Sequence, residues 1–427
     1  MRFLLFCVAA FIAAASAPLG AQVLTREYAR DSQLQELIAE AVRNSPEIRA
    51  AGNERLAAQH RVLPAGALED PMLEAGVINA PLRSQIFRRE DMTMKMLGLS
   101  QKIPFPGKLD LRQEVAAKDS ESIAHAYQET VNRVARDLKT AYFELALIAE
   151  SARLVEKNKQ ALEQFLKISE SRYSVGQGGQ ADVLKAQTQL SRMNDELIKL
   201  GRERQTIAAE LTRILGRRLD AAAPVPMALR SQEAKLQFEA LMETALGQRP
   251  QLLGLKSLVD RSNKSIELAR KDYYPDFDVK FSYGQRDNTL DGMRRDDLVG
   301  VTVAINLPVR RESRRDPRVA EAIAMRDQAM DLYQAQSNEL ASKLRQQLAI
   351  AEQSLASARL YATGILPQAR LAVESSLAAY RVNRVDFLTL LDSQMTVLNF
   401  EVSHAAALSG YNKALAEIDL LIGKPAI

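Results

Sequence analysis

Prolines recur along this 427-residue chain at a separation of 204 residues, and this repetition restricts the folds that the chain can adopt. Three further pairs share a separation of 207 residues, and a three-residue difference within one long segment accounts for the change. The six matched pairs are Pro46/Pro250, Pro71/Pro275, Pro104/Pro308, Tyr173/Tyr380, Gln187/Gln394 and Gly216/Gly423. Six pairs on two registers indicate a tandem duplication, so the fold contains two copies of one unit.

Each copy is predicted to contain a helix, two strands, a long helix, a turn and a second long helix. Residues 109–173 include neither proline nor glycine, and their apolar positions are spaced by three and four, which is typical of a coiled coil. A glycine-rich turn separates this helix from a second arm over 182–215. The alternating segments predict strands over 72–79, 92–101, 277–285 and 298–307.

The second copy is predicted to follow the same order with local differences. Asp316 and Pro317 are a good N-cap and first residue for its long helix. We expect a kink over 364–367 and a returning arm over 385–421. The expected organisation is a signal peptide at 1–21, a first repeat at 22–218, a linker at 219–235 and a second repeat at 236–427.

The N-terminus has the form of a secretory signal peptide. Arg2 precedes an apolar run over 3–17, and small residues follow. Cleavage is expected after Ala17 or Ala21, and Pro18, directly after the first candidate, favours the second. The only cysteine, Cys7, lies within this run, so we expect a mature chain with no disulfide and no thiolate metal site. No later segment has 18 consecutive apolar residues, and basic and acidic residues are mixed along the helices. Neither a helical anchor nor nucleic-acid binding is indicated.

The predicted strands alternate between an apolar face and a small or polar face. In 277–285 the apolar face holds Phe277, Val279, Phe281 and Tyr283. This pattern suits a membrane β-barrel and equally a face of a β-sandwich. The long polar helices favour the barrel, because a barrel wall can continue into a tube of helices. Four strands cannot close a barrel, so several copies of the chain are required, and three copies would supply twelve strands.

Two stretches resemble a known family. One is the strand-to-helix corner S-Q-K-I-P-F-P-G-K at 100–108, and the other is the second hairpin, with Tyr380 followed by D-F-L-T-L-L-D-S-Q at 386–394. The first hairpin adds Tyr173 and Gly176 followed by D-V-L-K-A-Q at 182–187. With the duplicated plan, these stretches resemble the TolC family of outer-membrane efflux proteins over 33–425, most closely its heavy-metal efflux branch.

The resemblance implies a mixed, mainly α fold with duplicated strand-strand-long-helix hairpins. It implies a homotrimer, with a 12-stranded β-barrel in outer-membrane lipid that continues into a 12-helix barrel in the periplasm. Such a protein is a passive exit duct for an inner-membrane transporter and a periplasmic adaptor, and it has no cofactor. Drug efflux or type I secretion is the alternative within the family. A periplasmic coiled-coil structural or adaptor protein without a barrel is the alternative of another class.

The resemblance also implies that the periplasmic mouth, where the adaptor would bind, lies at the tips of the two helical hairpins. The tip residues are Val175, Gly176 and Gln177 in the first hairpin and Val382, Asn383 and Arg384 in the second. Asn383 departs from the family's usual glycine. Asparagine can also adopt the left-handed conformation that such a turn requires.

Charged residues near the second tip are candidates for a gate. Asp386 and Asp392, repeated by symmetry, would form acidic rings at the mouth that favour cations. Arg381 and Arg384 could pair with neighbouring acids and hold the mouth shut. The alternative is that these are solvated charges and that Asp386 is an ordinary helix N-cap.

The strand-to-helix corners are interpreted as architectural joints rather than as a catalytic site. Pro104 and Pro106 remove backbone donors and so end strand pairing, and Gly107 allows the chain to turn into a helix. Pro308 marks the same joint in the second copy.

Three methionines are weak candidates for a metal site. Met92, Met94 and Met96 alternate along one predicted strand, and thioethers bind soft ions such as Cu(I). The repeat places them on the side of Gly300 and Thr302, which leaves Lys95 on the opposite, apolar side. The alternative is that methionine simply fills space.

Catalysis is not indicated by the sequence. The three histidines, His60, His125 and His404, are far apart and show no metal-ligand spacing. No nucleophile grouping, phosphate loop or dinucleotide motif occurs, so we expect no enzyme activity.

Overall fold

The computed structural model describes residues 32–80, 90–218, 224, 226, 229–230 and 236–426. The expected signal peptide at 1–21 and most of the expected linker at 219–235 lie outside the described residues. The chain divides into two compact units. The hairpin unit comprises Met1–Arg49, Glu129–Arg249 and Glu339–Ile427, and the sheet unit comprises Ala50–Gln128 and Pro250–Asn338.

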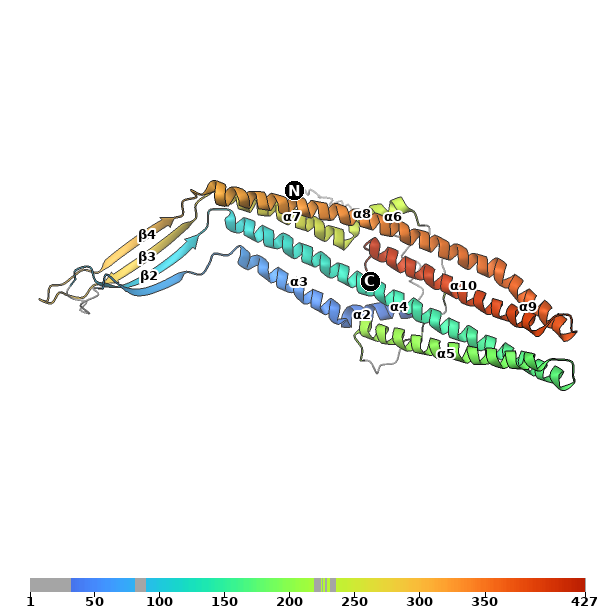
Figure 1. The fold of residues 1–427 in the computed structure, drawn as a ribbon. Helices are drawn as coiled ribbons and strands as arrows, with labels where there is room; N and C mark the ends of the chain where they lie inside the picture. Colours follow the sequence, from blue (N-terminus) through green and yellow to red (C-terminus); the bar gives the residue numbers. More distant parts are fainter. Residues whose placement is uncertain are drawn as a thin grey trace, which may run out of the picture. The chain divides into compact units, whose positions relative to one another are not determined.

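Both halves of the chain show the same order of elements (Figure 1). The first half contains α2 (Ser32–Asn44), α3 (Pro46–Ala65), β1 (Met72–Ile78), β2 (Met94–Ile103), α4 (Lys108–Ser174) and α5 (Gln180–Leu215). The second half contains α6 (Phe238–Gln248), α7 (Pro250–Lys271), β3 (Phe277–Gln285), β4 (Leu298–Ile305), the π turn η1 (Arg311–Arg315), α8 (Asp316–Leu360), the π turn η2 (Tyr361–Ile365), α9 (Leu366–Arg381) and α10 (Phe387–Leu421). The four predicted strands and the long helices are confirmed, with ends that differ by at most two residues.

The four strands form one antiparallel sheet in the order β1-β2-β3-β4. Directly opposite residues share a face, so the register fixes the composition of each side. One row across the sheet is Leu73, Leu99, Phe281 and Val301, and the next row, on the other side, is Glu74, Gly98, Ser282 and Gly300. One side is therefore apolar and the other small or polar. The apolar side is exposed, with Leu73 and Val301 each 70% accessible.

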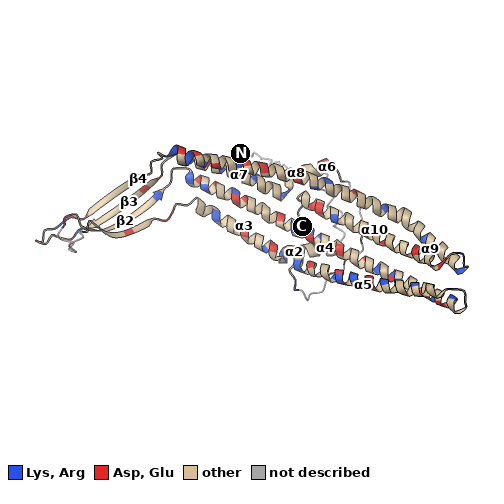
Figure 2. Ribbon diagram, viewed as in Figure 1, with Lys and Arg blue, Asp and Glu red and all other residues tan. Residues whose placement is uncertain are grey.

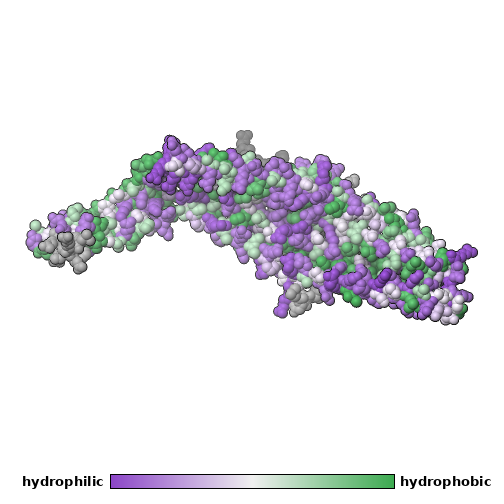
Figure 3. All heavy atoms as spheres, in the orientation of Figure 1, coloured by the Kyte–Doolittle hydropathy of each residue, from purple (hydrophilic) through white to green (hydrophobic). Residues whose placement is uncertain are grey.

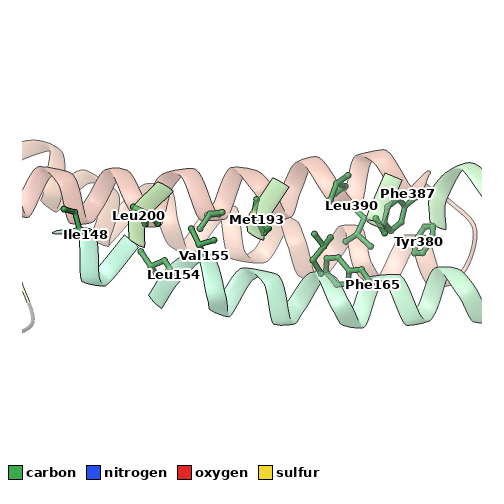
Figure 4. Close-up of a cluster of buried hydrophobic side chains, with 13 residues drawn as sticks. Ile148, Leu154, Val155, Phe165, Met193, Leu200, Tyr380, Phe387 and Leu390 are labelled. Atoms are coloured by element: carbon green, nitrogen blue, oxygen red, sulfur yellow. The ribbon is translucent and has the colours of Figure 1, made fainter. Parts of the chain in front are cut away.

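The core of the hairpin unit follows the predicted coiled-coil spacing. Five of the six predicted positions of α4 are buried, and Ala152 is partly buried against the same core. The buried five are Leu138, Ala141, Leu145, Ile148 and Val155. A cluster near the hairpin ends combines residues of α4, α5, α9 and α10 (Figure 4). No helix among the described residues has an 18-residue stretch apolar enough to cross a membrane.

The far ends of the two hairpins repeat the same backbone contact. Gly216 after α5 and Gly423 after α10 both have positive φ, 66° and 72°. A Cβ on Gly216 would lie 2.6 Å from the carbonyl oxygen of Asn44, and one on Gly423 would lie 2.5 Å from the Cα of Arg249. Glycine is required at both positions, because a side chain would collide with the turn before α3 or α7.

The second long helix differs from α4 by its π turns. Both η1 and η2 occur in the second half, where the matched separation changes from 204 to 207 residues. A π turn is wider than an α turn and accommodates extra residues. Where a kink was expected, over 364–367, the structure has the π turn η2, and Pro367 lies in the first turn of α9.

The prediction that Asp316 caps the long helix is wrong. Asp316 has helical angles, φ −58° and ψ −45°, because η1 already precedes it. Its carboxylate instead accepts a hydrogen bond from the hydroxyl of Tyr273.

Candidate functional site

The two hairpin tips are built by the same helix-ending motif. At the first tip Gly176 N–H donates to Tyr173 O at 3.1 Å, and Gln177 N–H donates to Arg172 O at 2.8 Å. At the second tip Asn383 N–H donates to Tyr380 O at 3.1 Å, and Arg384 N–H donates to Ala379 O at 2.9 Å. This pair of bonds is the Schellman motif, which satisfies the last carbonyls of a helix. The chain reversals are therefore specified locally, and the predicted tip residues do form the tips.

The left-handed position of each motif is occupied as predicted. Gly176 has φ 74° and Asn383 has φ 61°. Asparagine tolerates this conformation better than most residues with a side chain, so the replacement of the usual glycine is accommodated. Val175 and Val382, the residues before them, are largely exposed at the tips.

Arg172 connects the two tips, and sequence reasoning missed it. Its guanidinium donates to the carbonyl oxygen of Tyr380, to Gln177 O at 3.0 Å and to Asn383 Oδ1 at 2.5 Å. The same group lies over the Tyr380 ring, 4.5 Å from its centroid. One side chain at the end of α4 therefore holds both its own tip and the tip between α9 and α10. The available signal was a break in the repeat, since Arg172 corresponds to Ala379.

Aromatic and aliphatic side chains fill the space behind the tips (Figure 4). Tyr380 is 3% exposed and Phe387 is fully buried, and their rings meet edge to face at 5.7 Å. Phe165 of α4 and Leu390 of α10 belong to the same cluster. Burying each of these side chains contributes about 1.5–3 kcal/mol, so the apolar cluster stabilises the helix ends that carry the tips.

The charged residues predicted near the second tip have different roles within one chain. Asp386 is the N-cap of α10, and its carboxylate accepts from Thr389 N–H at 3.0 Å. The hydroxyl and the backbone N–H of Thr389 hold the pKa of Asp386 below its usual value. Asp392, Arg381 and Arg384 are exposed, and within the described chain none of their side chains forms an ion pair. Pairing of these arginines with acids remains a prediction for an assembly of several chains.

The first corner between strand and helix is fixed by charge as well as by proline. β2 ends at Ile103, directly before Pro104, and α4 begins at Lys108, directly after Gly107 with φ 83°. Lys108 is only 3% exposed, and its ammonium lies 2.9 Å from Asp276 Oδ1 and 3.3 Å from Asp272 Oδ1.

The joint roles predicted for this corner are consistent with the geometry on both copies. Pro106 lies in the turn before α4, and Pro308 lies between β4 and η1. Asp276 also accepts from the backbone N–H of Phe105 at 2.8 Å, so one carboxylate joins the start of β3 to the start of α4.

The predicted methionine row is only partly correct. Met94 and Met96 lie in β2 on the side of Gly300, as expected, but Met92 lies in the turn before the strand. Met94 packs onto Gly284, where a Cβ would lie 2.5 Å from its sulfur. Lys95, on the apolar side, lies near the strand end and pairs with Asp287 at 3.3 Å. Among the residues described here, no group of three His, Cys, Asp or Glu side chains is arranged to hold a metal ion.

Comparisons with known proteins agree with this geometry. The family model for outer membrane efflux proteins matches residues 37–217 and 241–424. The cobalt-zinc-cadmium resistance protein CzcC of Cupriavidus metallidurans is 22% identical over 380 residues, which cover 88% of each chain.

Solved structures share the fold. The outer membrane protein VceC of Vibrio cholerae superposes with a TM-score of 0.79 and 19% identity, covering 92% of this chain and 97% of that one. CusC, described as forming a transmembrane channel, gives a TM-score of 0.80 with 16% identity and 92% coverage of both chains. The matched family and structures are channels rather than enzymes. The resemblance to the TolC family is confirmed, and the chain belongs to the outer membrane efflux protein family.

Proposed function

We propose that the protein is a passive exit duct in the outer membrane, which passes substrate from an inner-membrane pump and its adaptor to the exterior. The observation that carries this proposal is the two-sided sheet. One side of the sheet is apolar and exposed. The strands β2, β3 and β4 are 10, 9 and 8 residues long, close to the 9–11 residues of a strand that crosses a bilayer. The other side of the sheet is small or polar, as the wall of an aqueous channel requires.

The open edges of the sheet support a homotrimer. β1 and β4 are the outermost strands, and an unpaired edge cannot remain in lipid. Three chains would join β4 of one copy to β1 of the next and close twelve strands. The helices that flank these edges support the same seam. Leu56 and Leu63 on α3, and Met325 and Leu332 on α8, are exposed and spaced by seven residues, which is coiled-coil spacing.

The tips are proposed as the mouth that meets the adaptor, because they expose Val175 and Val382 on two rigid turns. The cargo is proposed to be metal cations. The support is the similarity to CzcC, whose name describes cobalt, zinc and cadmium resistance. The alternative cargo is a drug or a secreted protein, and the cargo experiment below distinguishes it from metal cations.

The test of the channel is a matched pair of substitutions on one strand. Val301→Lys places a charge on the apolar side, which costs about 2–4 kcal/mol at the middle of a bilayer. Thr302→Lys places the same charge on the other side. We expect Val301→Lys to abolish heat-modifiable trimers in outer-membrane fractions and conductance in planar bilayers, while Thr302→Lys retains both. Equal behaviour of the two variants, or a wild-type monomer soluble without detergent, contradicts the proposal.

The cargo is tested with the cognate pump and adaptor in a host that lacks its own exit duct. Cells that carry all three components should tolerate Co²⁺, Zn²⁺ or Cd²⁺ better than cells in which the duct is Val301→Lys. Equal metal tolerance with unequal drug tolerance would assign a drug-efflux role instead.

A further inference from the structure

Arginines are concentrated where the chain leaves β4 and enters α8, within the sheet unit. Between 310 and 318 the arginines are Arg310, Arg311, Arg314, Arg315 and Arg318, and only Glu312 and Asp316 oppose them. Figure 2 shows Lys and Arg gathered at this end of α8. Because the two acids alternate with the arginines, the sequence shows no uninterrupted basic run here. Five arginines and two acids nevertheless leave an excess of positive charge over 310–318.

Two of these arginines are used within the fold. Arg315 Nε donates to the carbonyl oxygen of Asp272 at 2.7 Å, and Arg318 Nη1 lies 2.9 Å from the Asp272 carboxylate. These contacts secure the start of α8 against the end of α7. Their substitution would therefore test stability rather than binding.

The remaining three arginines are available to a ligand. Arg310, Arg311 and Arg314 are exposed, and none of them forms an ion pair within the part of the chain that the structure describes. Arg311 lies over the ring of Tyr273, 5.1 Å from its centroid, which holds its guanidinium without neutralising it. One of the two local acids, Asp316, accepts a hydrogen bond from the Tyr273 hydroxyl and forms no ion pair with these three arginines among the described residues.

The cationic cluster adjoins the apolar side of the sheet. The alternation of Val299, Val301, Val303 and Ile305 continues through Leu307 and Val309, which are 74% and 79% exposed. The arginines follow immediately. Figure 3 shows hydrophobic and strongly hydrophilic surface next to one another at this end of the sheet unit. Tyr274 is half exposed and stacks on Phe105 at 4.5 Å, and such aromatic side chains favour the boundary between lipid and water.

We propose that Arg310, Arg311 and Arg314 bind the phosphate groups of anionic phospholipids, in the leaflet on the helical side of the sheet. A guanidinium group can donate two parallel hydrogen bonds to the oxygens of one phosphate. The exposed apolar residues beside the arginines would contact the acyl chains of the same lipid. Inorganic phosphate offers the same head-group chemistry but would leave Leu307 and Val309 uncovered, so lipid is the expected ligand. This inference rests on the proposed function, because it needs the sheet to lie in a bilayer.

The test compares lipids on the purified full-length mature protein in neutral detergent. Binding of short-chain phosphatidylglycerol and of phosphatidylethanolamine is measured by native mass spectrometry, with inorganic phosphate in excess as a competitor. The variant carries Arg310→Gln, Arg311→Gln and Arg314→Gln. A charge-matched control carries Arg192→Gln, Arg202→Gln and Arg204→Gln on the exposed face of α5.

We expect wild type and control to prefer the anionic lipid, and the triple variant to lose roughly a hundredfold in affinity, about fivefold for each arginine. Inorganic phosphate should not displace the lipid. An unchanged preference in the triple variant, no preference in wild type, or displacement by phosphate overturns the inference. If the triple variant does not fold, the salt dependence of wild-type binding decides, because an arginine–phosphate site must weaken as salt rises.

Conductance of the same preparations in planar bilayers separates the two proposals. A wild-type pore without any lipid preference overturns this inference alone. A protein that forms no pore overturns the proposed function.

Discussion

Gly176 and Asn383 occupy the same left-handed position of two helix ends that lie 207 residues apart, with φ of 74° and 61°. The backbone bonds around them are the same, but the side chains differ in what they reach. A Cβ placed on Gly176 would meet nothing within 4 Å, whereas the Asn383 amide oxygen accepts from Arg172. The two copies therefore share one turn geometry, and the side chain at the left-handed position reaches Arg172 only at the second tip.

Substitution of Asn383 should separate the backbone requirement from the contact. Asn383→Gly keeps the turn and removes the bond to Arg172, and Asn383→Ala removes the bond and also adds strain of about 1–2 kcal/mol at positive φ. We expect Ala to lower the thermal midpoint of unfolding more than Gly does. Thermal unfolding of both variants, followed by circular dichroism, measures this order. A midpoint for Asn383→Ala equal to or above that for Asn383→Gly would show that the left-handed backbone at this position does not disfavour a side chain.

Arg172 is expected to hold the two tips of one chain together and so to oppose opening of the mouth. Arg172→Gln removes charge-assisted bonds to Tyr380 O and Asn383 Oδ1, each worth about 1.5–3 kcal/mol when buried and less at this partly exposed site. We expect the ratio of open to closed channels in planar bilayers to rise roughly tenfold, the equivalent of about 1.4 kcal/mol. Arg192→Gln, on the exposed face of α5, is the control and should leave conductance unchanged. An unchanged open fraction in Arg172→Gln shows that the link does not hold the mouth.

The sequence predicted those features that depend on local chemistry. β3 was predicted to the residue, because alternation of Phe277, Val279, Phe281 and Tyr283 is a strand pattern that needs no partner to be recognised. The 67-residue helix α4 follows from the absence of proline and glycine. The left-handed Asn383 was expected because the family's usual residue at that turn is glycine and asparagine can adopt the same conformation.

Other features depend on contacts between distant residues and could not be predicted. Arg172 meets Tyr380 across 208 positions, and nothing near Arg172 specifies that partner. Asp316 looked like an N-cap because Pro317 follows it, but the π turn η1 directly precedes it, so Asp316 already lies within a helical run. Met92 was placed in the strand by alternation alone, whereas pairing with β1 begins at Met94 and pairing with β3 at Lys95.

The glycines at the far ends of the hairpins should be irreplaceable. In Gly216→Ala the new Cβ would lie 2.6 Å from Asn44 O, at φ 66°. We expect a loss of at least about 2 kcal/mol in the free energy of unfolding. Gly201 is exposed in the middle of α5, and a Cβ there would meet nothing within 4 Å. Gly201→Ala should therefore raise the free energy of unfolding by about 0.5–1 kcal/mol. Denaturant unfolding should show a lower free energy of unfolding for Gly216→Ala and a higher one for Gly201→Ala. A lower free energy of unfolding in both variants would contradict the assignment of the loss to the contact between Gly216 and Asn44.

Acid should weaken the contact between α2 and the end of α5. Arg217 donates to both carboxylate oxygens of Glu40, each at 2.6 Å, and these hydrogen bonds lower the pKa of Glu40 although partial burial opposes them. Because the folded pKa is the lower one, the stabilisation is fully present above the unfolded value of about 4.3 and is lost as pH falls through the folded value. After allowance for screening at this partly exposed site, we expect about 0.5–1 kcal/mol.

The measurement is the free energy of unfolding at about pH 6 and at a lower pH at which Glu40 of the folded protein has taken up its proton, found by titrating wild type downward from pH 6. Arg217→Gln should be less stable than wild type at the higher pH and nearly equal to it at the lower pH, because protonated Glu40 no longer needs the guanidinium. Arg202→Gln, whose neighbour Glu203 lies on the exposed face of α5, serves as the control and should follow the wild-type pH dependence. A constant difference between Arg217→Gln and wild type at both pH values would show that Arg217 acts through packing of its side chain rather than through the Glu40 carboxylate.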